Sequence, residues 1–111
     1  MARTPATLYT LPGSYDTDGL QVSWLSFDDA ANMDFTPTER EIVMFKGTGA
    51  ATVTVVSIAD PFSRTGDLEK VLAIGNIWSF GPIKKTGFLQ ADGKIWLNST
   101  ADVDYMILKT P

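Results

Sequence analysis

The sequence predicts an all-β fold, a single antiparallel β-sandwich or small barrel of about eight short strands with an extended N-terminal arm. The clearest strand is 52–58, where every residue except Ser57 is branched at Cβ, which suits a pleated sheet and suits a helix poorly. Asp92-Gly93, between two apolar runs, is typical of a hairpin turn. Turn residues recur about every 8 to 12 residues, and no stretch offers the helical crossover of about a dozen residues that a parallel βαβ fold needs.

Each expected strand is a short apolar or alternating run that ends at a turn signal. The segment 28–38 is polar and small, and it is expected to form a loop with at most one helical turn near its end. Thr38 and Glu41 have the spacing of a helix capping box, but the apolar run after them is short and ends at Gly47, which favours a strand. The expected strands are Leu20–Phe27, Ile42–Phe45, 51–58, Lys70–Ile74, 76–82, Phe88–Gln90, Ile95–Leu97 and Val103–Lys109.

Residues 1–19 are predicted to form an extended N-terminal arm or an edge strand, in front of a single β-domain at 20–111. Two prolines and two glycines in this segment disfavour a long helix and leave the chain extended. Its apolar residues Leu8, Tyr9 and Leu11 are poorly suited to solvent. We therefore expect them to contact a partner by adding to a sheet edge of a neighbouring protein. The alternative, in which the arm lies on its own domain, stays open.

The composition argues against several classes of function. The chain has 111 residues, enough for one domain with one core, and it contains neither cysteine nor histidine. Without cysteine no thiolate can serve as a nucleophile or zinc ligand, and histidine is the commonest general base and transition-metal ligand, so an enzyme is not expected and no catalytic residue or cofactor is assigned. A net charge of −4 disfavours nucleic acid as a partner. No apolar run approaches the ~20 residues of a membrane span, and the first residues lack the apolar core of a standard signal peptide.

The loop after the β-branched run is dense in turn residues. It contains Asp60, Pro61, Arg64, Gly66 and Asp67. Two carboxylates on one loop can share a cation, but an aspartate before a proline and another after a glycine are typical of turns, where they accept hydrogen bonds from nearby backbone N–H groups. We favour this structural role for the five residues, and we expect no metal.

A second acidic group, with Asp28, Asp29, Asn32 and Asp34, resembles a loose calcium cluster. It lacks both the alternating order and the terminal bidentate glutamate of an EF-hand loop. A solvated acidic loop is the favoured interpretation. The glycine-rich segment 47–50 is a turn and not a phosphate loop, because it leads into a strand and lacks the lysine that would follow.

The three tryptophans, Trp24, Trp78 and Trp96, could form a ligand platform, but aromatic residues in the strands of a small sandwich usually fill its core. Trp78 is the exception. Ile77 and Trp78 are neighbours that point to opposite faces of one strand, so one of these two apolar side chains is expected to be covered by another chain. The predicted partner-binding residues are Leu8, Tyr9, Leu11 and Trp78.

Three segments carry a resemblance to a known group of proteins. They are GTGAATVTVVSIADPFSRTGDLEKVLAIG, then FGPI, then GFLQADGKIWLN. In this order they resemble small β-rich structural proteins of tailed phages and prophages, thought to include head decoration (cement) proteins. The likeness covers residues 47–98, about half of the chain. It does not extend to the first forty residues, so no mode of attachment is implied.

The resemblance implies a non-enzymatic virion protein that is made in the host cytoplasm, lies on the capsid exterior, and binds and stabilises the assembled head. Its implied partners are the major capsid protein and further copies of itself, with a trimer as one arrangement. The alternative is another phage structural part, in the tail, at the head-tail joint or in host adhesion. A third possibility, an enzyme or an inhibitor of host defence, would need titratable groups gathered in a cleft.

Overall fold

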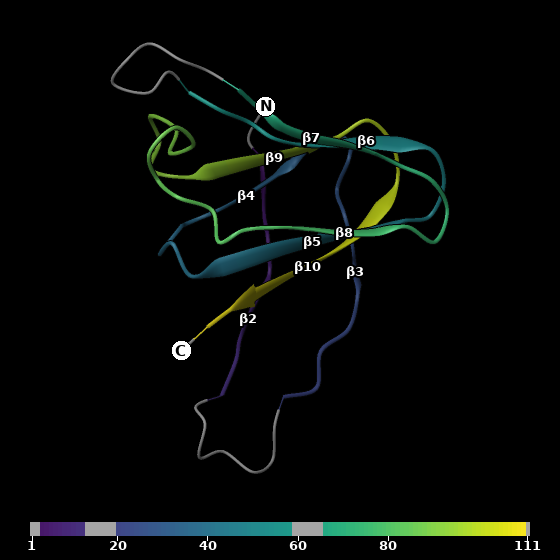
Figure 1. The fold of residues 1–111 in the computed structure, drawn as a ribbon, viewed down its shortest axis with the longest axis horizontal. Helices are drawn as coiled ribbons and strands as arrows, with labels where there is room; N and C mark the ends of the chain where they lie inside the picture. The colour runs from purple at the N-terminus through teal and green to yellow at the C-terminus, as the bar shows by residue number, and fades with distance from the viewer. Residues whose placement is uncertain (1–2, 13–19, 59–65, 111) are drawn as a thin grey trace.

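The computed structural model describes residues 3–12, 20–58 and 66–110. Within them the fold is all-β, as the sequence predicts, and two sheets face each other as in a sandwich (Figure 1). None of the described segments forms a helix long and apolar enough to cross a membrane. The strands are β1 (Thr4–Pro5), β2 (Leu8–Thr10), β3 (Leu25–Ser26), β4 (Met33–Phe35), β5 (Glu41–Gly47), β6 (Ala51–Val55), β7 (Leu68–Leu72), β8 (Ile77–Phe80), β9 (Ile95–Ser99) and β10 (Val103–Lys109).

The first sheet has the order β1-β4-β9-β6-β7, and the second has the order β2-β10-β5-β8, with β3 also paired to β10. The sheets are mixed and not purely antiparallel as expected, because β1 runs parallel to β4 and β2 runs parallel to β10. Both parallel pairs involve the N-terminal segment. The other pairs are antiparallel.

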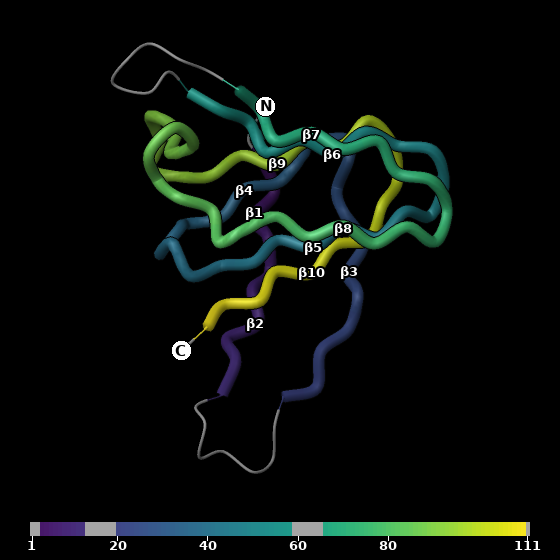
Figure 2. The backbone as a smooth tube through the Cα atoms, in the orientation of Figure 1, coloured from purple at the N-terminus to yellow at the C-terminus, as the bar shows by residue number. Residues whose placement is uncertain are grey.

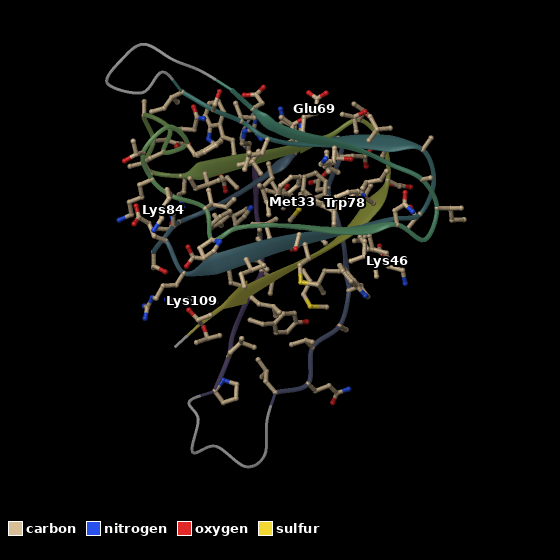
Figure 3. All side chains as sticks on the ribbon, viewed as in Figure 1. Met33, Lys46, Glu69, Trp78, Lys84 and Lys109 are labelled. Carbon is tan, nitrogen blue, oxygen red and sulfur yellow. The ribbon has the colours of Figure 1, made fainter. Side chains whose placement is uncertain are left out.

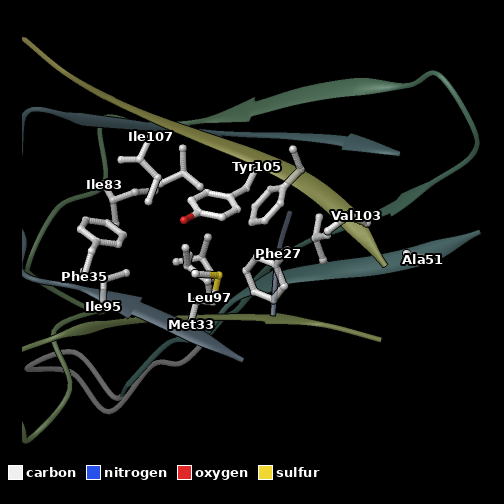
Figure 4. Packing of buried hydrophobic residues seen from close by; sticks show 14 of the residues in the cluster. Phe27, Met33, Phe35, Ala51, Ile83, Ile95, Leu97, Val103, Tyr105 and Ile107 are labelled. Carbon is white, nitrogen blue, oxygen red and sulfur yellow. The ribbon is translucent and has the colours of Figure 1, made fainter. Parts of the chain in front are cut away.

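The core lies between the sheets and follows from strict alternation along the longer strands. In β5, β6 and β9 every second residue is buried, as expected of strands with one face on a core. Aromatic rings fill the centre: Phe27 stands edge-on to Phe45 and to Tyr105, each at 5.9 Å between centroids (Figure 4). The core thus uses phenylalanine and tyrosine, whereas none of the three tryptophans is buried in it.

The N-terminal segment lies on its own domain and crosses from one sheet to the other (Figure 2). This differs from the favoured expectation of an arm that reaches a partner, and it agrees with the alternative of an edge strand. The guanidinium of Arg3 donates to the backbone oxygen of Leu97 at 3.0 Å and to Oδ1 of Asn98 at 2.6 Å, which fixes the start of the chain on the first sheet. Further along, Leu11 donates its N–H to the backbone oxygen of Lys109 at 2.8 Å.

Two local expectations are wrong, and long-range pairing explains both. The segment 28–38 contains a strand, β4, which is buried because it pairs with β9. Phe88–Gln90 is not a strand: the N–H groups of Phe88 and Leu89 both bond to the backbone oxygen of Lys85 in a turn. Asp92-Gly93 does close a tight turn, but the partners of β9 are β4 and β6.

Thr38 and Glu41, which have the spacing of a capping box, are hydrogen-bonded to each other at the start of a strand and not of a helix. Glu41 begins β5 and is only 1% exposed. Its carboxylate accepts hydrogen bonds from the backbone N–H of Thr38, at 2.6 Å, and from the Thr38 hydroxyl. Between them Glu39 has a positive φ of 66°, so the chain turns here, and the buried carboxylate closes that turn.

Candidate functional site

Four exposed apolar side chains belong to β7, to β8 and to the turn between them, and these two strands form the outer edges of the two sheets (Figure 1). Val71 is 72% exposed, Ile74 78%, Ile77 53% and Trp78 43%. We call these four residues the apolar rim. Among the large apolar side chains exposed in the described residues, all but Leu20 belong to it. Their exposure at neighbouring sheet edges makes this region the candidate contact surface.

The rim follows from strand alternation at a sheet edge. Trp78 lies opposite Phe45 of β5, which is fully buried, so the indole points toward the space between the sheets. Ile77 points to the outer face of its sheet, opposite Lys46. Ile74 lies in the turn that joins β7 to β8, where Gly75 adopts a φ of +83°. Val71 lies opposite Thr52 of β6 and points to the outer face of the first sheet, so Val71 and Ile77 are exposed on the outer faces of different sheets.

The side chain of Lys70 lies at the open edge between the two sheets. Lys70 on β7 lies opposite the fully buried Val53, so its side chain also points inward. Its Nζ lies 4.6 Å from the centre of the Trp78 ring, within reach of a cation–π interaction. Figure 3 shows Trp78 between the two layers, with Glu69 on the outer side of one and Lys46 on the outer side of the other. At the opening between the two sheets, the edge therefore presents the Trp78 ring with the positive charge of Lys70 beside it.

Of the four predicted partner-binding residues, the structure places only Trp78 on this rim. Leu8 packs against the core. The Tyr9 hydroxyl lies 3.3 Å from the hydroxyl of Ser23, and Leu11 is half-buried beside the end of β10. Leu8, Tyr9 and Leu11 therefore make contacts within the chain, at the far edge of the second sheet.

Asp67 accepts hydrogen bonds from Ser57, which lies shortly after the end of β6. One carboxylate oxygen accepts hydrogen bonds from the backbone N–H of Ser57 at 2.7 Å and from its hydroxyl at 2.8 Å, and the N–H of Gly66 donates to the same hydroxyl at 3.0 Å. These bonds hold the pKa of Asp67 below its ordinary value. Asp60, Pro61 and Arg64 lie outside the described residues.

The acidic group at 28–34 is divided between two places. Asp28 accepts a hydrogen bond from the hydroxyl of Thr4 and another from the N–H of Ala31 at 3.2 Å, and these bonds lower its pKa. Asp34 lies on β4 near Arg3. In the described part of the chain, no three carboxylates gather in a way that could hold a metal ion.

The tryptophans do not share a surface, so they form no common platform. Trp96 lies on the outer face of the first sheet, where its ring is 4.4 Å from the guanidinium of Arg3 and its Nε1 donates to Asp92 at 3.1 Å. Partial burial at this position lowers the pKa of Arg3. Trp24 lies 6.0 Å from the ammonium of Lys46, on the second sheet. The expectation that Trp24 and Trp96 fill the core is wrong.

Sequence reasoning missed Lys70, Val71 and Ile74. Each belongs to an ordinary strand or turn pattern, and the sequence alone does not show that β7 lies at a sheet edge or which face each side chain takes. No family model matches the chain, and no curated protein or solved structure is significantly similar to it.

Proposed function

We propose that the chain is a non-enzymatic structural protein of a phage virion, a decoration protein that binds the assembled head and stabilises it. The observation that carries this proposal is the apolar rim on the free edges of β7 and β8. The rim lies inside residues 47–98, the part of the chain that resembles phage decoration proteins. The contact surface and the resemblance therefore fall on the same segment.

The character of the surface also supports a binding role. The apolar groups line an edge where two strands end their sheets, which is the geometry of a contact with another protein. Three carboxylates of the described residues accept hydrogen bonds at separate places, Asp67 from Ser57, Asp28 from Thr4 and Asp92 from Trp96, and Arg3 lies near Asp34 and Asp92 on the outer face of the first sheet. Catalysis would require such groups to converge.

A weak contact per chain can be enough for attachment to a shell that is built of many identical subunits. Four exposed apolar side chains give a small surface, which alone supports only weak binding. If copies of the chain associate around a symmetry axis of the head, each further contact forms within an already bound assembly. The effective concentration then raises the overall affinity by about 10²- to 10⁴-fold without a larger surface per chain.

Co-sedimentation tests the proposal. Purified protein is mixed with emptied heads, and separately with tails, from the phage or prophage that encodes it. We expect the protein to pellet with heads in a saturable ratio, and the heads to resist heat or low salt better when decorated. Pelleting with tails and not with heads would favour the alternative, a tail, joining or adhesion component. Pelleting with neither would refute a structural role in the virion.

A further inference from the structure

We infer that the free edge of β8 takes up an extended segment of the partner as an additional strand, and that acidic and apolar residues alternate in this segment. This inference rests on the proposed function only in naming the partner as a head protein. The mode of binding is β-strand addition, in which main-chain hydrogen bonds give affinity and alternate side chains give specificity.

Among the described strands, β8 is the one sheet edge without a device against pairing. Exposed edges are commonly protected by short length, by proline or by a charged residue, above all one that points inward. β1 has two residues, one of them Pro5, and β7 has the inward-pointing Lys70. β2 has three residues, and its side of β10 is shared with the two-residue β3. The four residues of β8, Ile-Trp-Ser-Phe, carry neither charge nor proline.

The register identifies which backbone groups are free. The N–H of Gly47 donates to the backbone oxygen of Asn76 at 2.8 Å, and these residues are opposite each other in the β5–β8 register. In an antiparallel pair, hydrogen-bonded and non-hydrogen-bonded positions alternate, so Trp78 and Phe80 also direct their N–H and C=O groups toward β5. Ile77 and Ser79 direct theirs toward the open side.

Side chains beside the edge define the chemistry of the added strand. A residue of the partner that points inward would lie next to Trp78 and the ammonium of Lys70, which favours aspartate or glutamate. A residue that points outward would lie next to Ile77, more than half of which is exposed, and this favours an apolar side chain. Because successive side chains of a strand point to opposite faces, the two preferences together favour a segment in which acidic and apolar residues alternate.

A second copy of this chain fits the edge poorly. Symmetric antiparallel pairing of β8 with itself around Trp78 would bring the two Lys70 ammonium groups toward each other, because each lies against its own Trp78. Like charges that face each other in a partly desolvated contact oppose association. Charge complementarity therefore selects an acidic segment of a different protein.

Amide hydrogen exchange in free and head-bound protein tests the inference. We expect exchange at Ile77 and Ser79 to slow about tenfold or more in the saturated complex, because both N–H groups become hydrogen-bonded. Ser79→Pro removes one of these donors without touching the β5 ladder, and should weaken head binding about tenfold. Ser79→Val, which keeps the N–H, is the matched control and should bind like the natural chain.

The charge is tested in the same assay. Lys70→Glu should weaken head binding by about fivefold or more, whereas Lys84→Glu, at an exposed position outside the rim, should have little effect. Two synthetic octapeptides, Val-Glu and Val-Lys repeated four times, separate charge from the head itself. The acidic peptide should slow exchange at Ile77 and Ser79, and the basic peptide should not.

The outcomes separate this inference from the proposed function. If the protein binds heads but exchange at Ile77 and Ser79 is unchanged, strand addition is refuted and the decoration role stands. If the protein binds neither heads nor tails, the proposed function fails, and the acidic peptide alone decides the inference: unchanged exchange refutes it. If Ser79→Pro does not fold, amide exchange at Ile77 and Ser79 of the natural chain, free and head-bound, decides the inference.

Discussion

Replacing Val71 and Ile77 together by threonine removes apolar surface from the rim and keeps the branched Cβ that strands favour. Val71 is 72% exposed and Ile77 53%, so about a quarter of one side chain and half of the other is buried within the chain. Complete burial of such a side chain is worth about 1.5–3 kcal/mol. The double variant should therefore lose only about 1 kcal/mol of folding stability. If a partner covers the exposed parts of both side chains, its binding free energy should weaken by about 1.5–2.5 kcal/mol in the double variant, which is at least about tenfold in affinity.

Urea denaturation, followed by tryptophan fluorescence, measures the stability loss, and co-sedimentation with heads measures the affinity. Val53→Thr is the control: Val53 is fully buried, so its hydroxyl should cost about 1–3 kcal/mol of stability while leaving the rim intact. Two results would refute the reasoning. If the double variant is destabilised as much as Val53→Thr, the rim belongs to the core, and if it binds heads like the natural chain, the rim is not the contact.

Three further predictions concern the scaffold. Gly47→Ala should lower the melting temperature, because its Cβ would lie 2.2 Å from a backbone oxygen in the turn after β7, whereas Gly49→Ala meets nothing within 4 Å and should be tolerated. Asp67→Asn should melt below the natural chain at pH 7; the lowered pKa of Asp67 means that its stabilisation is present at neutral pH and lost as the pH falls below about 4, so the two melting curves should converge in acid. Glu41→Ala should cost about 1–3 kcal/mol in urea titrations, since it removes the buried carboxylate that accepts the N–H and the hydroxyl of Thr38, and an unchanged midpoint would contradict this role.

The sequence predicts the fold class well because the longer strands carry their own signal. β5, β6 and β10 each have five to seven residues, and the buried face of each is apolar over most of its length. β4 has only three residues within a polar segment, so it becomes a strand through pairing with β9 and not through its own composition. The strand expected at 88–90 is absent although its local signal is strong. The Asp92-Gly93 turn predicts that residues 88–90 pair with β9, but a turn signal does not determine which strand pairs with β9, and the partners are β4 and β6.

The candidate site was only partly predictable. The adjacent apolar residues Ile77 and Trp78 predict that the domain's own core does not cover one of the two side chains. In the structure both are exposed. Val71 and Ile74 carry no such signal, because the sequence does not show that Val71 points to the outer face of its sheet or that Ile74 lies in the turn between β7 and β8. Which strands lie at the edge depends on the pairing order of the whole sheet, and that order is a property of contacts far apart in the sequence.

The strand β10 determines when the second sheet can close. β10 pairs with β2, β3 and β5, so residues 103–109 are the common partner of strands from the first half of the sequence. Until residues 103–109 have been synthesised, those three strands have no β10 to pair with, and the second sheet cannot close. Until then their edges stay unpaired, and unpaired strand edges favour aggregation.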